Sequence, residues 1–355
     1  MLFTLVLTLL VATIGGTILF KLKVPGGMLV GSALAAAVLS VGFDMGHMPL
    51  GARVVAQLTA GAFIGTTMTR ADILRLKTLA KPASVILGMH MVSMLSLGTL
   101  LYFISPLDLA TAFFSAIPGG LTDVPLIAAD MGANAPKVAM AQFTRMILVM
   151  ATFPTLISVI GRKEQKKTSY KNGTEMAESL KESDGKTRHH LWKRFIVTYT
   201  VALAFGFIGF FSGVPAGVLA FSVLGVLGMN LMWGNAALPR FMRKVAQVLA
   251  GAFIGTSVTQ ADLLGIHFLI LPFIVLIMGY FANCFLTGWM LRRISPMGRK
   301  ESMLAATPAG ASDMALISMD MGVESTDLVV LQIVRLAVVI LVFPQVIALV
   351  MWLVG

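Results

Sequence analysis

Two short sequences within long apolar stretches contain the residues best suited to chemistry. Residues 118–123 read Pro-Gly-Gly-Leu-Thr-Asp, and residues 308–313 read Pro-Ala-Gly-Ala-Ser-Asp. Proline and glycine break helices, and a carboxylate inside a bilayer costs about 3 kcal/mol and usually marks an ion or proton path. We therefore expect Asp123 and Asp313 to coordinate an ion or to carry a proton. The glycines expected to contribute backbone to the site are Gly119, Gly120 and Gly310.

Helix capping is the structural alternative for the polar residues after each break. A Ser or Thr side chain accepts a backbone N–H at a helix start, and an acidic residue in the first turn suits the helix dipole. Capping is sufficient to explain Thr122 and Ser312, which stay candidate site residues. It is less adequate for the two aspartates, because a charge at membrane depth is costly.

A second candidate group is an arginine on the next apolar segment. Arg145 lies eight residues after Lys137, roughly 12 Å along a helix and therefore close to mid-membrane. Gln142 lies on the same helix face. An arginine at this depth needs an anionic partner, either Asp123 or Asp130, or a carboxylate or phosphate of a substrate. In the structural alternative, a buried Asp–Arg pair only braces the broken segment. The second half repeats this group as Gln332, Arg335 and Asp320.

The elements that must position these groups are membrane helices. Of the 355 residues, 57% are hydrophobic and 12% are charged, whereas soluble chains carry roughly 25% charged residues. The mean hydropathy is +0.89, and residues 1–20 and 83–104 are each long enough to cross ~30 Å of hydrocarbon. The sequence predicts an all-α polytopic membrane protein. It argues against a soluble enzyme, a disordered chain, a coiled coil and an outer-membrane barrel.

Charge and cysteine content argue against several partners and cofactors. The net charge of +11 is typical of the Lys- and Arg-rich cytoplasmic loops of membrane proteins, so we expect no nucleic-acid binding. Cys284 is the only cysteine, and the five histidines form no ligand motif. We therefore expect no metal, no cofactor and no enzyme activity; a membrane oxygenase in particular would lack its metal ligands.

The chain is a tandem duplication with a constant offset. Residues 55–72 recur as residues 245–262, with thirteen of eighteen positions identical, at an offset of 190. The same offset relates the two breaks, and it relates Arg145 to Arg335. Chance does not keep one register over most of a repeat, so each half should form the same series of elements.

The duplication divides the chain into two membrane repeats. Residues 1–161 form the first and residues 195–355 the second, and a charged linker at 162–194 joins them. Residues 1–20 have no positive residue before their apolar core and have a counterpart in the second repeat, so we expect this segment to be retained. The apolar segments of the first repeat lie near 1–20, 26–43, 53–69, 83–104, 107–132 and 137–160.

The basic loops predict that the two repeats have opposite orientations. The first repeat is basic at Lys21, Lys23 and residues 70–81, whereas the second is basic at residues 240–244 and 292–300. Because Lys- and Arg-rich loops stay in the cytoplasm, we expect inverted repeats with the linker inside. Inversion needs an odd number of crossings in each repeat, so one of the six segments should not cross.

We expect the segment at 107–132 not to cross, because its break leaves two pieces that are each about half a membrane deep. The prediction is a re-entrant hairpin there and another at 302–321, with five crossing helices beside each. A broken crossing helix with a miscounted neighbour is the alternative. In either case, matching broken segments in inverted repeats are typical of a transporter site.

Two further features indicate packing. Gly61-x-x-x-Gly65 and Gly251-x-x-x-Gly255 carry small residues at one-turn spacing, which is typical of close helix contact. His90 lies in an apolar segment, and Tyr280 stands at the matching position of the second repeat. We therefore interpret His90 as a packed histidine.

Several doubled motifs resemble the membrane AbrB family. They are Ala-Gly-Ala-Phe-Ile-Gly-Thr, Pro-[Gly/Ala]-Gly-x-[Thr/Ser]-Asp, and Gln-x-x-Arg followed by Phe-Pro. The resemblance covers essentially the whole chain and implies a multi-pass protein of the bacterial inner membrane. Members have been named regulators of gene expression or ammonia monooxygenases. The family also resembles cation:proton antiporters and anion transporters with inverted five-helix repeats. No particular substrate is implied.

These features favour a secondary transporter that moves a small anionic solute coupled to H⁺ or Na⁺. Half-helix N-termini and two arginines would attract an anion, and two aspartates suit the coupling cation. The alternative is a membrane-embedded regulator of gene expression, with the linker as its output element. The expected partners are the lipid bilayer and a small molecule or ion. The oligomeric state is open, with a homodimer among the options.

Overall fold

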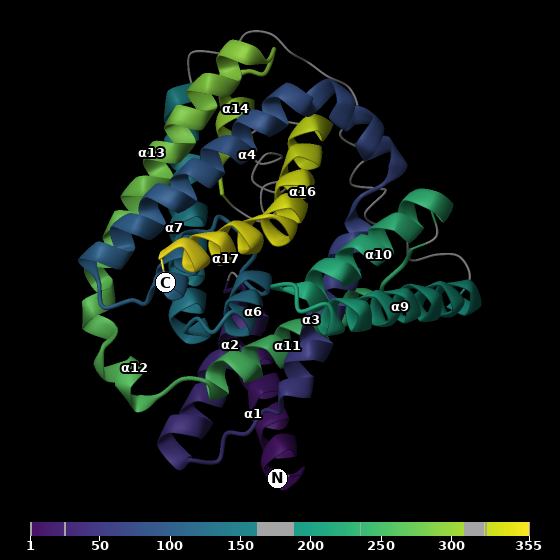
Figure 1. Ribbon diagram of the computed structural model, residues 1–355, viewed down its shortest axis with the longest axis vertical. Helices are drawn as coiled ribbons and strands as arrows, with labels where there is room; N and C mark the ends of the chain where they lie inside the picture. The colour runs from purple at the N-terminus through teal and green to yellow at the C-terminus, as the bar shows by residue number, and fades with distance from the viewer. Residues whose placement is uncertain are drawn as a thin grey trace.

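The computed structural model describes residues 2–24, 26–161, 188–234, 236–308, 323 and 325–354 (Figure 1). Within these ranges every regular element is a helix, so the predicted all-α class is confirmed. The first repeat contains α1 (Leu2–Lys21), α2 (Gly27–Ala37) and its π-helical extension η1 (Val38–Gly42), α3 (Leu50–Thr67), α4 (Arg70–Ile104), α5 (Leu109–Ala116), α6 (Asp123–Asp130) and α7 (Ala135–Gly161). The second contains α9 (Arg188–Phe211), α10 (Gly217–Trp233), α11 (Arg240–Thr256), α12 (Gln260–Leu264), the 3₁₀ helix η4 (Ile266–Leu269), α13 (Ile270–Ile294), α14 (Arg299–Ala306), α16 (Thr326–Leu341) and α17 (Phe343–Val354).

Five helical spans in the described ranges are long and apolar enough to cross a membrane. Large apolar side chains such as Phe103 and Trp352 are exposed on these spans, which suits contact with lipid rather than water. The chain is therefore a helical membrane protein. The spans are Phe3–Lys21, Arg70–Ile104, Trp192–Phe211, His267–Ile294 and Asp327–Val354.

Helix boundaries in the two repeats recur at the offset of 190 residues. α4 begins after Thr69 and α12 after Thr259, and both threonines form a capping box with an aspartate three residues later. α5 ends at Ala116 and α14 at Ala306, with nearly the same backbone angles at the next residue. The repeated sequence therefore forms the same local structure twice.

Two helices begin earlier in the sequence than the apolar stretches predict. α4 begins at Arg70 rather than at residue 83, so the basic residues 70–81, predicted as a loop, are helical. The capping box at Thr69 starts this helix before the apolar stretch begins, and apolar content alone does not reveal it. α9 begins at Arg188, inside the predicted linker. The other linker residues, 162–187, lie outside the described ranges.

The small-residue motifs on α3 and α11 are packing positions, as predicted. A Cβ added at Gly61 would lie 2.8 Å from the Ser222 Cβ of α10. A Cβ at Gly251 would lie 2.7 Å from the Ser32 Cβ of α2. Each repeat therefore contributes a glycine-bearing helix that packs closely against the second helix of the other repeat.

Equivalent helices of the two repeats cross each other in antiparallel directions. α4 and α13 lie side by side (Figure 1), with the Asn283 side chain donating to the Met89 carbonyl at 2.9 Å and Gly279 facing Leu97 further along α4. On α3 and α11, two cation–π contacts repeat the pattern at offset 190. They are Arg53 over Phe253 at 5.5 Å and Arg243 over Phe63 at 5.1 Å.

Candidate functional site

The first broken segment consists of two short helices whose outer ends lie together. Asp108 caps the start of α5 by accepting a hydrogen bond from the Thr111 amide at 3.0 Å. The chain then leaves helical geometry between Ala116 and Asp123, across the predicted break. After α6, the Asn134 amide donates to the Thr111 hydroxyl at 2.8 Å. The chain leaving α6 therefore lies beside the first turn of α5.

Two side chains of α7 bind the end of α5. The Gln142 amide donates to the carbonyls of Phe114 at 3.1 Å and Ile117 at 3.0 Å. The Arg145 guanidinium donates to the Ile117 carbonyl at 2.9 Å and to the Gly119 carbonyl. The last carbonyls of a helix have no partner within it and carry the negative end of its dipole. Gln142 and Arg145 therefore stabilise the broken end as a polar cap.

The second repeat contains the same arrangement. The Gln332 amide donates to the carbonyls of Leu304 at 3.0 Å and Ala305 at 3.3 Å, and Arg335 donates to the Thr307 carbonyl at 2.7 Å. Arg335 is only 4% exposed, and Arg145 only 5%. Two guanidinium groups are thus buried at matching breaks, where the dipole of each half-helix ends.

These contacts correct one expectation about the arginine partner inside the protein. Arg145 binds backbone carbonyls, whereas we expected Asp123 or Asp130 as its internal partner. Asp130 instead forms an ion pair with Arg53 on α3 at 3.0 Å and accepts a hydrogen bond from Gln57. A guanidinium can be satisfied by the free carbonyls of a helix end, and the break supplies those carbonyls.

Asp123 lies at the start of α6 and is buried, with 9% of its surface exposed. Its carboxylate lies over Gly120, where an added Cβ would overlap one of the carboxylate oxygens. Among the described residues, Arg243 on α11 is the charge that acts on this carboxylate, but it does so without a hydrogen bond or a close ion pair. Thr122 makes no capping hydrogen bond, so capping as the explanation of Thr122 was wrong.

Four of the predicted site residues belong to the second break. They are Gly310, Ser312, Asp313 and Asp320, which lie outside the described ranges.

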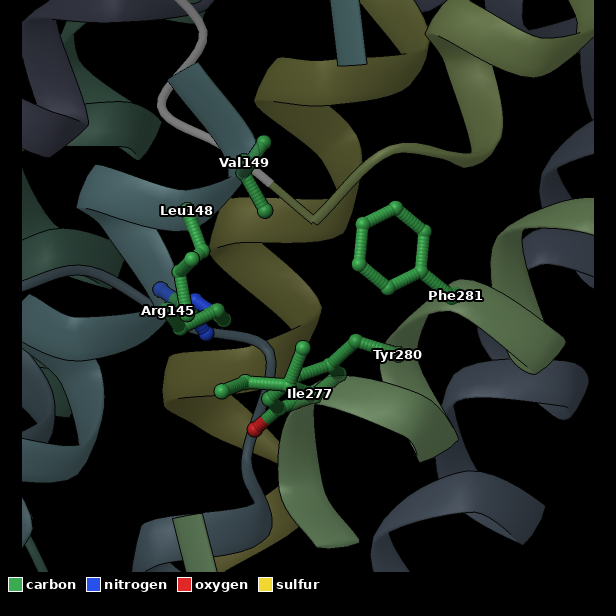
Figure 2. A pocket seen from close by; sticks show the side chains of 6 residues that line it. All are labelled: Arg145, Leu148, Val149, Ile277, Tyr280 and Phe281. Carbon is green, nitrogen blue, oxygen red and sulfur yellow. The ribbon is translucent and has the colours of Figure 1, made fainter. Parts of the chain in front are cut away.

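Sequence reasoning missed the aromatic residue beside Arg145. Tyr280 on α13 lies under the guanidinium, with 5.7 Å from the Arg145 Cζ to the ring centroid, and its hydroxyl donates to the Ser115 carbonyl at 3.2 Å. Figure 2 shows both side chains lining a cavity of about 10 Å³ between α7 and α13, which is room for about one water molecule. Inside the protein, the Arg145 Nε and the Gln142 carbonyl oxygen have no hydrogen-bond partner.

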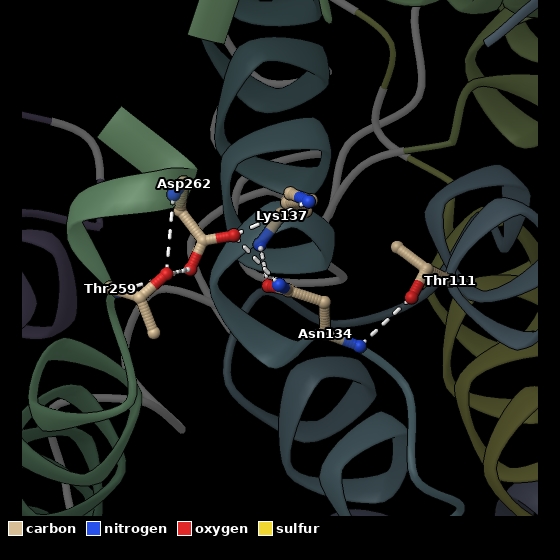
Figure 3. A network of polar contacts seen from close by, with 5 residues as sticks. All are labelled: Thr111, Asn134, Lys137, Thr259 and Asp262. Atoms are coloured by element: carbon tan, nitrogen blue, oxygen red, sulfur yellow. Dashed lines mark hydrogen bonds and ion pairs between the residues drawn. The ribbon is translucent and has the colours of Figure 1, made fainter. Parts of the chain in front are cut away.

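A polar network joins the start of α7 to the second repeat (Figure 3). The Asp262 carboxylate pairs with Lys137 at 3.3 Å, and accepts hydrogen bonds from Asn134 at 2.9 Å and from the Thr259 hydroxyl at 2.7 Å. Burial alone would raise the pKa of Asp262, but the hydrogen bonds from Thr259, Asn134 and Lys137 outweigh it and lower the pKa below its usual range. The capping motif Thr-x-x-Asp reveals the Thr259 part of this network in the sequence, but not its contact with Lys137.

Comparison with known proteins gives a consistent match along the chain. The family model described as "Transition state regulatory protein AbrB" matches residues 47–351. A Bacillus subtilis (strain 168) protein named "Uncharacterized protein YhjN" is 26% identical, over 94% of this chain and 90% of its own. An Escherichia coli (strain K12) protein named "Putative regulator AbrB" is 24% identical, over 91% of this chain and 89% of its own.

Proposed function

The chain belongs to the AbrB family, and we propose that it is a secondary transporter, not an enzyme, that moves a small anionic solute together with H⁺ or Na⁺. One observation carries the proposal: a buried Gln–Arg pair caps a broken helix in both repeats. Ionisable residues at membrane depth are costly and usually belong to substrate or ion pathways. Broken helices at matching positions of two repeats are where transporters bind substrate.

The charge balance at the first break favours an anionic solute. Arg145 contacts neutral carbonyls and an aromatic ring, and Arg53 already neutralises Asp130. A solute carboxylate would therefore neutralise a buried positive charge for which the described residues provide no anion. The unpaired Arg145 Nε and Gln142 carbonyl oxygen add one free donor and one free acceptor for such a solute.

Asp123 supports coupling to a cation. Its buried carboxylate accepts no hydrogen bond from a described residue, and Arg243 on α11 acts on it only through space. A carboxylate compensated so weakly at this depth is unfavourable. A bound Na⁺ or a proton would neutralise it. We expect Asp123→Asn to impair ion coupling more than it lowers the amount of folded protein. Equal losses of coupling and of folded protein would favour a structural role.

The antiparallel contacts support inverted repeats. A two-fold axis that runs along the helices would keep α4 and α13 parallel, whereas their antiparallel contact fits an axis perpendicular to them. The hydrogen bond between Asn134 and Thr111 fits a re-entrant hairpin, because it holds both ends of the α5–α6 segment together. In a bacterial inner membrane, a reporter near Gly173 should then be cytoplasmic and one after Gly355 periplasmic; the same side for both would overturn the inversion.

Reconstitution into liposomes tests the transport proposal. We expect uptake of at least one of acetate, succinate, glutamate or phosphate, driven by an inward H⁺ or Na⁺ gradient. The same solute should raise the melting temperature of the purified protein. Arg145→Ala combined with Arg335→Ala should abolish both effects. Arg293→Ala, which removes only a contact with exposed Trp289, is the matched control and should leave them unchanged.

A membrane-embedded regulator is the second candidate, because the family description and the Escherichia coli relative both name a regulator. Its output element would be the charged sequence between the repeats. A regulator should keep its effect on gene expression in the double arginine variant but lose it when residues 165–188 are deleted. The opposite result, with expression responding only to the arginines, would favour transport.

A further inference from the structure

Position 90 and its equivalent, position 280, hold different residues at the same place in the fold. Tyr280 belongs to the second repeat but contacts the first break. Its hydroxyl donates a hydrogen bond to the Ser115 carbonyl, and the Arg145 guanidinium lies over its ring. His90 comes from the first repeat, on α4, which packs against α16 of the second repeat. It is 1% exposed. From the sequence we expect a packed histidine.

The hydrogen bonds of His90 leave one ring nitrogen free. Nδ1 lies 2.8 Å from the Ile86 carbonyl, and a carbonyl only accepts, so Nδ1 carries the hydrogen of the neutral ring. Nε2 then has a bare lone pair. It is fully buried and has no hydrogen-bond partner among the described residues. Most buried polar atoms have a partner, so this acceptor needs an explanation.

The groups around His90 set the condition under which it can take a proton. Burial is the first obstacle to a charged imidazole, and Arg335 and Arg145 are the described charges that act on it in addition. The other titratable groups buried on the adjoining α13 are Tyr280 and Cys284, which are uncharged. A proton on Nε2 would therefore face two guanidinium charges, and Coulomb repulsion is strong in a poorly solvated site. An anion held by the arginines would remove that repulsion, and its negative charge would also offset part of the lost hydration of a protonated ring.

We propose that His90 Nε2 is the proton acceptor that couples transport to H⁺, taking up a proton only together with the anionic solute. This inference rests on the proposed transport function and selects H⁺ rather than Na⁺ for coupling through this residue. The proton comes from water on the side to which the site is open and binds the Nε2 lone pair. It returns to water on the other side, so only one N–H bond forms and breaks.

The variant His90→Tyr tests this role, because it places the residue of the second repeat at the equivalent position of the first. Liposomes loaded with a pH-sensitive dye report proton entry after external succinate or glutamate is added. Exchange of radiolabelled solute, with the same solute inside, reports binding and movement without a gradient. We expect solute-driven proton entry to fall at least tenfold in His90→Tyr while exchange stays within about twofold of wild type.

Each outcome decides a separate point. Proton entry in His90→Tyr equal to that of wild type overturns the role of His90 and leaves transport intact. Solute uptake without proton entry in wild type also overturns it. Failure of wild type to take up acetate, succinate, glutamate and phosphate alike overturns transport and this role together. His90→Gln is the second variant, because glutamine keeps a hydrogen-bond acceptor but binds no proton. If both variants lose solute exchange, His90 has a structural role and the proposal is overturned.

Discussion

The two repeats place an ion pair at equivalent ends of their last long helices, but the two pairs differ in burial. Lys137, at the start of α7, binds Asp262, which is 9% exposed and also held by Asn134 and Thr259. Position 327, the equivalent of 137, is an aspartate at the start of α16. It binds Arg75 at 3.3 Å, and both side chains are about half exposed, at 47% and 49%.

This difference shows how one duplicated sequence produces two unequal ends. A half-exposed ion pair is worth about 0–1 kcal/mol. The Lys137–Asp262 pair is better shielded, with side-chain exposures of 26% and 9%, and its carboxylate also accepts hydrogen bonds, which contribute more when one partner is charged, about 1.5–3 kcal/mol. The backbone differs too, since α4 is continuous where the second repeat has α12, Gly265 and η4. The two ends therefore differ both in their ion pairs and in their backbone.

The largest effect is expected from Asp262→Ala. The change leaves Lys137 and Asn134 without their shared acceptor and removes the capping box of α12. A hydrogen bond to a charged group and a helix cap together contribute about 3 kcal/mol, so we expect a loss of that size. Thermal unfolding of the purified protein in detergent measures it. Asp72→Ala, at the equivalent and exposed capping box of α4, is the matched control and should cost about 1 kcal/mol. Equal losses would remove the distinction between the ends.

The next largest effect is expected at the first break. A Cβ at Gly119 would lie 3.0 Å from the Val339 Cγ1 of α16 and would overlap Val124. We expect Gly119→Ala to cost about 2 kcal/mol, because overpacking forces neighbouring side chains or backbone to shift. The sequence carries alanine at the equivalent position 309, so an unchanged melting temperature would show that both breaks tolerate a methyl group.

The sequence predicted which residues of the two repeats are equivalent better than it predicted the contacts that those residues make. An offset of 190 was enough to identify Arg145 and Arg335 as equivalent, and both are buried at broken helices. The carbonyl partners of these arginines were not predictable, because spacing along a helix does not say which backbone groups a distant turn leaves unpaired. Similarly, Arg53 and Asp130 form a pair between α3 and α6 that no local motif indicates.

A smaller effect, with a defined sign, is expected from acid. The pKa of Asp262 is lowered in the folded protein by its hydrogen-bond donors, so its contribution to stability is present above the unfolded pKa of about 3.9. That contribution is lost as the pH falls towards the lower, folded value. We expect the wild-type melting temperature to fall more steeply than that of Asp262→Asn between about pH 5 and pH 3. Parallel curves would contradict the lowered pKa.

The smallest effect is expected at the exposed end, and a pair of double-mutant cycles measures it. Arg75→Ala, Asp327→Ala and their combination should give a coupling energy of no more than about 0.5 kcal/mol, because solvent and salt screen a half-exposed pair. The same cycle on Lys137 and Asp262 should give at least about 1 kcal/mol, since burial strengthens the attraction. Added salt should weaken the first coupling more than the second.

Exchanging the charges, with Arg75→Asp and Asp327→Arg, should preserve stability at the exposed end. Lys137→Asp with Asp262→Lys should not, because lysine cannot accept the hydrogen bonds from Asn134 and Thr259. If both exchanges were tolerated equally, the buried network would be no more specific than the exposed pair, and the two ends would differ only in solvent access.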